Sequence, residues 1–241
     1  YVSKKSLILQ KILQVSRRMA SGFLKGREYV LVETYLEFPR LWGLGTSSTL
    51  IHNVAKWADI NPYDLLAMTF KGSGYDIACA NSRKAIFYQI VDGDPTVAEV
   101  SYVPACTEQM MFLYLGEKAN SQNGMTYFNA NCEYTDADIA AVSRIADSWS
   151  KVSKIEEMEA LIEDHESRMS KILKFETIKE KRFSDYPHSI KSLGAWGGDF
   201  ALVTYRNADE CIAYFKNKGI DTFYSFNELT VEDEIAQIQL F

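Results

Sequence analysis

The chain has 241 residues, of which 47% are hydrophobic and 24% charged, with a formal net charge of -6 at pH 7. This composition is typical of a globular protein of one or two domains that buries its own core. An acidic chain without a Lys/Arg-rich face argues against nucleic acid as the main partner. The sequence contains no run of about 18 apolar residues, so we predict no membrane-spanning helix. We therefore expect a cytoplasmic protein that binds neither nucleic acid nor membrane.

The chain contains few residues of the types that build metal centres. Its four cysteines are widely spaced and form no CxxC pair: Cys79, Cys106, Cys132 and Cys211. This spacing favours reduced thiols over disulfides. The histidines His52, His165 and His188 are scattered, which predicts surface or core-edge positions rather than ligands or bases.

The first elements follow from periodicity. Apolar residues recur at helical spacing over residues 1–24, and Gly22 and Gly26 are expected to end this helix. The chain begins with Tyr1 rather than Met, so we expect an N-terminal part to be missing. The run REYVLVETYLE at 27–37 alternates apolar and polar residues and predicts a strand.

A helix is predicted after the stretch PRLWGLGTSS, because Leu50, Val54 and Trp57 form an apolar face. Thr46, Ser47 and Ser48 are expected to cap it. Asn61-Pro62 ends this helix and starts another, with Asp64 in the first turn.

The rest of the chain mixes both types of element. Strands are predicted at 85–91, 99–104, 109–116 and 221–226, and the segment 191–206 is predicted to hold a glycine cluster followed by a strand. Helices are predicted at 135–150, 154–174 and 208–218, and residues 117–124 are expected to form a polar loop. The order indicates an α+β fold, with one domain over residues 1–106 and a second over 107–241.

Three glycine clusters are candidates for function. In GLGTSS, the loop enters a helix whose first N–H groups are unpaired and carry partial positive charge. The residues that could hold a phosphate are Gly43, Leu44, Gly45, Thr46, Ser47 and Ser48. The alternative is an ordinary helix cap, since the stretch matches neither a Walker A loop nor GxGxxG.

The other two clusters are weaker by themselves. GSGYD places Asp76 after a tight turn, where it could accept a proton from a hydroxyl or bond the local backbone. GAWGGD contains Gly194, Gly197 and Gly198, which could shape a turn or let the backbone approach a ligand.

Together, the three clusters resemble the motifs of the GHMP kinase superfamily, in particular its bacterial GYDIA subgroup. PRLWGLGTSS at 39–48 is similar to the family's PxxxGLGSS loop, KGSGYD at 71–76 to its GxxSGxD segment, and LGAWGGDFAL at 193–202 to its C-terminal glycine loop. The string GYDIA stands at 74–78. The resemblance spans nearly the whole chain.

The resemblance implies an S5-like domain, here truncated, and a ferredoxin-like domain, with ATP and a small-molecule acceptor between them, in a monomer or homodimer. It implies ATP-dependent phosphorylation of a small hydroxylated or phosphorylated acceptor, possibly mevalonate-like. The first loop would hold the triphosphate, Ser47 or Ser48 would bind Mg²⁺, and Asp76 would orient or deprotonate the acceptor hydroxyl, which suits phosphoryl transfer.

The pattern departs from the family in three places. The N-terminal motif with its basic residue is absent, and no acid precedes GSGYD where several members carry a Mg²⁺-binding Glu, because Asp64 is too early. Asp199 would repel phosphate, so we expect it to face away or to mark an altered pocket. A decarboxylase of diphosphomevalonate type and a degenerate nucleotide- or metabolite-binding protein remain as alternatives.

Overall fold

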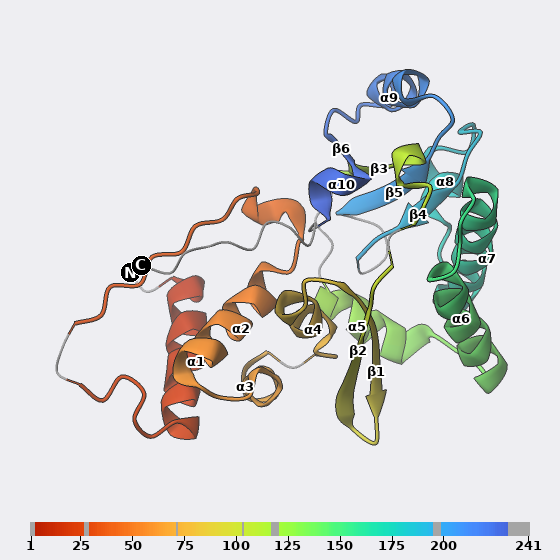
Figure 1. The fold of residues 1–241 in the computed structure, drawn as a ribbon. Coiled ribbons are helices and arrows are strands. Elements are labelled where there is room, and N and C mark those ends of the chain that lie inside the picture. Colours follow the sequence, from red (N-terminus) through yellow and green to blue (C-terminus); the bar gives the residue numbers. More distant parts are fainter. Residues whose placement is uncertain are drawn as a thin grey trace. The chain divides into compact units, whose positions relative to one another are not determined.

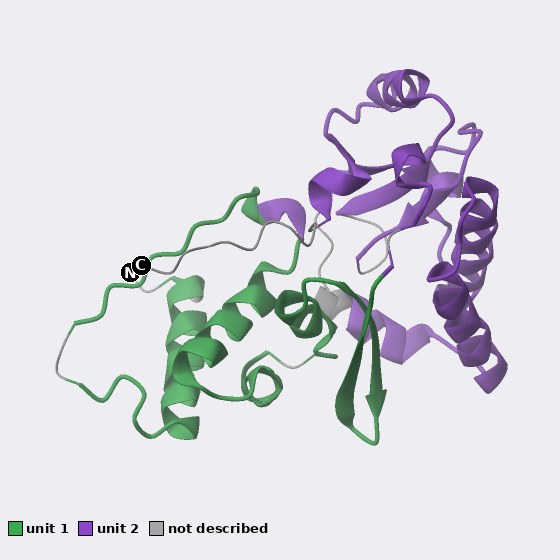
Figure 2. Cartoon of the chain, viewed as in Figure 1, with its two compact units in different colours: residues 1–40, 44–101 green, residues 41–43, 102–241 purple. Residues whose placement is uncertain are grey.

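The computed structural model describes residues 3–26, 29–70, 72–102, 104–116, 121–194 and 199–230 (Figure 1). The chain divides into two compact units, which Figure 2 shows in different colours. Unit 1 comprises residues 1–40 and 44–101, and unit 2 comprises residues 41–43 and 102–241. Helices and two antiparallel sheets make the fold α+β, as the sequence predicted.

Unit 1 is mainly helical. Its elements are α1 (Lys4–Met19), α2 (Thr46–Ala58), α3 (Pro62–Thr69), α4 (Tyr75–Asn81) and the hairpin of β1 (Ala85–Val91) with β2 (Asp94–Val100). Apolar faces of α1, α2 and α3 meet in one core that includes Ile12, Ile51 and Leu65, all without exposed surface. The α2–α3 junction is confirmed: the side-chain oxygen of Asn61 accepts a hydrogen bond from the Tyr63 N–H at 2.8 Å.

The prediction of a strand at 27–37 is wrong. Residues 29–36 form neither helix nor strand, and residues 27–28 lie outside the described part. The side chains of Leu31 and Tyr35 are 85% and 87% exposed. An alternating pattern becomes a strand only when a neighbouring strand pairs its backbone N–H and C=O groups, and no described residue pairs with this segment.

Unit 2 contains a four-stranded antiparallel sheet with the strand order β4-β5-β3-β6. The strands are β3 (Met110–Tyr114), β4 (Ile190–Ser192), β5 (Phe200–Thr204) and β6 (Phe223–Ser225). The helices are α5 (Ser121–Asn131), α6 (Asp136–Trp149), α7 (Ile155–Leu173), α8 (Ile178–Arg182), α9 (Ala208–Asn217) and α10 (Phe226–Leu229), with 3-10 turns at Arg40–Trp42 and Thr107–Gln109.

The central strand β5 is buried along its whole length, because apolar clusters cover both faces of the sheet. Phe183 and Phe215 pack in one cluster, and Met158 and Ile162 of α7 pack in the other. Trp42 also belongs to this unit: its ring lies 5.4 Å from that of Tyr114 and 5.6 Å from that of Phe200. The chain just before the GLGTSS loop is thereby anchored on the sheet.

Several element bounds differ from the predictions. The prediction of a polar loop at 117–124 is wrong for its second half, because residues 121–124 form the first turn of α5. Residues 117–120 lie outside the described part. The strand predicted at 99–104 is shifted, since β2 ends at Val100 and pairs with β1 across the turn at Asp92-Gly93. All four cysteines are free, as expected.

Candidate functional site

The GLGTSS loop enters α2 through two glycines with left-handed backbone. Gly43 has φ +72° and Gly45 has φ +70°, a conformation that residues with a Cβ adopt at a cost. The helix begins at Thr46, and its N-cap residue is Gly45, which offers no side-chain hydrogen bond. The prediction that Thr46, Ser47 and Ser48 cap the helix is therefore wrong, because they form its first turn.

This end of α2 has the local features of an anion-binding helix terminus. A Cβ built on Gly45 would meet no heavy atom within 4 Å, so the space beside it is open. Leu44 and Ser47 are exposed, and Thr46 and Ser48 are half-buried. The first N–H groups of a 13-residue helix thus lack a side-chain acceptor and face accessible space.

Asp76 meets this loop inside unit 1. It lies in the first turn of α4, after Gly74 with φ +80°, and the Ser48 hydroxyl lies near its carboxylate. The carboxyl keeps contact with solvent, yet desolvation by the surrounding protein raises its pKa, and the nearby Ser48 hydroxyl offsets this only in part. The structure therefore brings the first two predicted motifs together.

Three tyrosines fix the turn before Asp76, and the sequence analysis did not identify them as site residues. A Cβ at Gly74 would lie 2.8 Å from Cδ1 of Tyr63 and 3.1 Å from the hydroxyl oxygen of Tyr88. That Tyr88 hydroxyl donates to the Ser73 carbonyl, and the rings of Tyr75 and Tyr88 meet edge to face at 5.8 Å. Only glycine fits at position 74, so these rings hold the Asp76 backbone in place.

The third cluster lies in unit 2 and is described only in part. Gly194 follows β4 with φ +71°, while Gly197 and Gly198 lie outside the described residues. Asp199 is 8% exposed, and its carboxylate packs against Gly43: a Cβ built there would lie 2.2 Å from Asp199 Cγ. Asp199 was expected to face away from a bound phosphate or to mark an altered pocket, and the structure places its carboxylate against Gly43. A carboxylate occupies the space beside Gly43.

We predict that Gly43→Ala destabilises unit 2 by about 2–4 kcal/mol, because it combines left-handed strain with overpacking against Asp199. Gly219→Ala is the matched control, since Gly219 has φ +82° and open space around it. This variant should lose about 1–2 kcal/mol, the cost of the left-handed backbone without any overpacking. Urea unfolding of both variants measures the difference. Equal losses in the two variants would contradict the contact, and adding Asp199→Ala to Gly43→Ala should remove the excess.

The described residues show no cluster of three or more His, Cys, Asp or Glu side chains that could hold a metal ion. Ser47 and Ser48 carry hydroxyl oxygens in the first turn of α2, and the Asp76 carboxylate lies near Ser48. Hydroxyl and carboxylate oxygens suit Mg²⁺, which commonly completes its shell with water and substrate phosphates. Among the described helices, none is both long and apolar enough to cross a membrane.

A comparison with solved structures gives a likeness in fold. No protein-family model matches the chain, and no curated protein matches it. A crystal structure of the Lin0012 protein from Listeria innocua matches with a TM-score of 0.63 and 15% sequence identity, over 90% of this chain and 78% of that chain. At this identity the likeness shows a shared fold and transfers no activity or site.

Proposed function

We propose that the chain is an ATP-dependent kinase of the GHMP type that phosphorylates a small hydroxylated or phosphorylated acceptor, possibly mevalonate-like. One observation carries the proposal: α4, whose first turn holds Asp76, packs against α2, whose first turn holds Ser48. The Ser48 hydroxyl is near enough to lower the pKa of the Asp76 carboxyl, so a helix terminus suited to phosphate and a carboxylate suited to a hydroxyl group lie close together. Phosphoryl transfer needs this pairing of an anion cradle with a group that positions the nucleophile.

The phosphates of ATP would lie at the N-terminus of α2. Gly45 leaves open space there, and the N–H groups of Thr46, Ser47 and Ser48, in the first turn of α2, carry the positive end of the helix dipole. Ser47 or Ser48 would bind the Mg²⁺ that neutralises phosphate charge. Phosphate placed here gains backbone hydrogen bonds without needing a Walker A lysine.

Asp76 would orient the acceptor hydroxyl and take up its proton. A carboxylate whose pKa is raised by desolvation is a stronger base than an ordinary aspartate. The backbone of Asp76 is fixed by Gly74 and the surrounding tyrosines. The carboxylate is therefore held in position before a substrate binds.

A second candidate is a degenerate nucleotide- or metabolite-binding protein of the same fold without kinase activity. The buried side chain of Asp199 against Gly43 favours it, because it fills the space beside the first glycine of the loop. The two candidates differ in whether nucleotide binding depends on Mg²⁺.

Calorimetric titration of ATP into the chain, with Mg²⁺ and with a chelator, tests the proposal. We expect micromolar binding that is lost with the chelator, and we expect Gly45→Val to abolish it, because the side chain would occupy the open space beside the helix terminus. Gly93→Val in the β1–β2 turn is the matched control: Gly93 also has positive φ and open space but lies outside the loop.

Three outcomes are informative. Mg²⁺-dependent binding that Gly45→Val abolishes and Gly93→Val preserves supports the kinase. ATP binding with the same affinity in the presence of Mg²⁺ and of the chelator supports the second candidate, a binding protein without kinase activity. Unchanged affinity in Gly45→Val rejects the loop as the phosphate site.

A further inference from the structure

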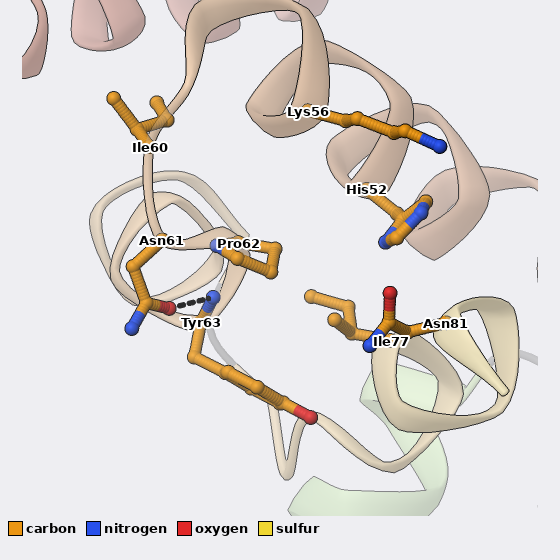
Figure 3. A pocket seen from close by; sticks show the side chains of 8 residues that line it. All are labelled: His52, Lys56, Ile60, Asn61, Pro62, Tyr63, Ile77 and Asn81. Carbon is orange, nitrogen blue, oxygen red and sulfur yellow. Dashed lines mark hydrogen bonds between the residues drawn. The ribbon is translucent and has the colours of Figure 1, made fainter.

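A pocket in unit 1 shares Tyr63, which packs against Gly74, with the proposed kinase site, but it includes none of the groups proposed to react. It lies between α2, α3 and α4 and has a volume of about 400 Å³, within the usual range for small-molecule sites. Figure 3 shows its lining side chains, none of which belongs to the GLGTSS loop or is Asp76.

The polar part of the lining carries positive charge and hydrogen-bond donors but no acid. Lys56 and His52 come from α2, Asn61 and Tyr63 from the start of α3, and Asn81 from the end of α4. Lys56 forms no ion pair with any residue that the structure describes. Lys56 is exposed, and a cation among lining residues that include no acid favours an anionic ligand.

His52 adds an unsatisfied group. Its Nδ1 atom is inaccessible to solvent and has no hydrogen-bond partner among the described residues. Burial and the nearby charge of Lys56 both lower the pKa of this histidine, so the ring is neutral at pH 7. A neutral imidazole carries its hydrogen on one nitrogen, and Nε2 is favoured because a buried N–H at Nδ1 would lack an acceptor. In Figure 3 the His52 ring and the Asn81 amide point toward each other.

The rest of the lining is apolar. Ile60, Pro62 and Ile77 contribute side chains to the wall, beside the ring of Tyr63. A few convergent polar groups on an apolar wall are typical of sites for small organic molecules rather than for bare ions.

We propose that this pocket binds a small organic anion, with Lys56 contacting its acidic group and the apolar side chains of Ile60, Pro62 and Ile77 contacting its body. The acidic group is a carboxylate or a phosphate ester, since both accept hydrogen bonds from an ammonium and from amides. The site is separate from the proposed ATP site, so its ligand is a second metabolite that binds beside α2, α3 and α4.

Titrations followed by NMR test this site with three probes of similar ring size. Benzoate carries a carboxylate, phenyl phosphate carries a phosphate ester, and benzamide is the neutral counterpart of benzoate. We expect saturable shifts at His52, Tyr63 and Asn81 with at least one anionic probe, and an affinity for benzamide about tenfold weaker. Comparing benzoate with phenyl phosphate identifies which acidic group the pocket takes.

Lys56→Met keeps the length of the side chain and removes its charge. We expect it to weaken binding of the anionic probe by about tenfold and to leave benzamide unaffected. Lys84→Met is the matched control, since Lys84 is an exposed lysine of the same unit outside the pocket. ATP titration of Lys56→Met should match that of the unchanged chain, so failure of this site and failure of the kinase proposal are distinguishable.

Equal binding of benzamide and both anions would overturn the proposal, as would unchanged anion affinity in Lys56→Met. Shifts confined to residues outside the pocket would overturn it as well.

Discussion

Replacing Asp76 with asparagine is expected to leave ATP binding intact and to reduce turnover by roughly 100-fold or more, as for loss of a catalytic base. Asparagine keeps the size of the side chain and an oxygen that can accept a hydrogen bond from the nearby Ser48 hydroxyl. It cannot take a proton from the acceptor hydroxyl. The measurement compares kcat of the two proteins with the same acceptor and Mg-ATP.

The pH dependence gives the same test a second readout. Desolvation raises the Asp76 pKa above its ordinary value of 3.8, so the basic form is lost as pH falls through this raised pKa. The kcat of the unchanged chain should therefore fall at low pH, and the pH profile of Asp76→Asn should lack this fall. Asp94→Asn in the β1–β2 hairpin is the control and should retain both rate and pH profile. Near-normal turnover in Asp76→Asn would remove the base assignment.

The second large effect concerns the stability of unit 2. Glu166 of α7 is 4% exposed and pairs with Lys191 of β4, with Oε1 3.2 Å from Nζ. Its other oxygen accepts a hydrogen bond of 2.7 Å from the Ser192 hydroxyl. Lys191→Met leaves this carboxylate buried without its cation and should destabilise the unit by about 3–5 kcal/mol.

Two further variants separate the pair from general effects of losing a lysine. Lys151→Met removes an exposed ion pair with Asp147, whose side chains are 69% and 65% exposed, and should cost at most about 1 kcal/mol. The double variant Glu166→Gln with Lys191→Met removes both charges and should recover much of the loss. Urea unfolding measures all three, and a small effect of Lys191→Met would show that Glu166 finds another partner.

The pair also predicts how stability depends on pH. Burial alone would raise the pKa of Glu166, but the contacts from His165, Lys191 and Ser192 together outweigh it and lower that pKa. A carboxylate with a lowered folded pKa contributes stability above its unfolded pKa, and that contribution is lost as pH falls through the folded value. Acid should therefore narrow the difference in stability between the unchanged chain and Lys191→Met.

Sequence pattern located the helices best, because a helix satisfies its backbone hydrogen bonds within itself. The helices predicted at 135–150 and 154–174 are α6 and α7 to within a residue at each end. The hairpin strand at 85–91 is also where it was predicted, since its partner follows after a two-residue turn. Local information suffices for such elements.

The strand predicted at 27–37 shows the limit of this reasoning. Its alternation of apolar and polar residues is clear in the sequence, yet residues 29–36 form no strand. Strand formation depends on a second segment that supplies hydrogen-bond partners, and periodicity carries no information about whether such a segment is in place.

The candidate site likewise has local features that the sequence indicates and contacts between distant residues that it does not. The sequence by itself indicated glycine turns before α2 and before α4, because turn chemistry is a local property, and the structure has these glycines with positive φ. Only the tertiary structure decided that Ser48 meets Asp76, that Asp199 packs against Gly43, and that His52 and Lys56 line a pocket. These contacts join residues far apart in the chain, and the packing of helices and strands, rather than any local pattern, sets which of them touch.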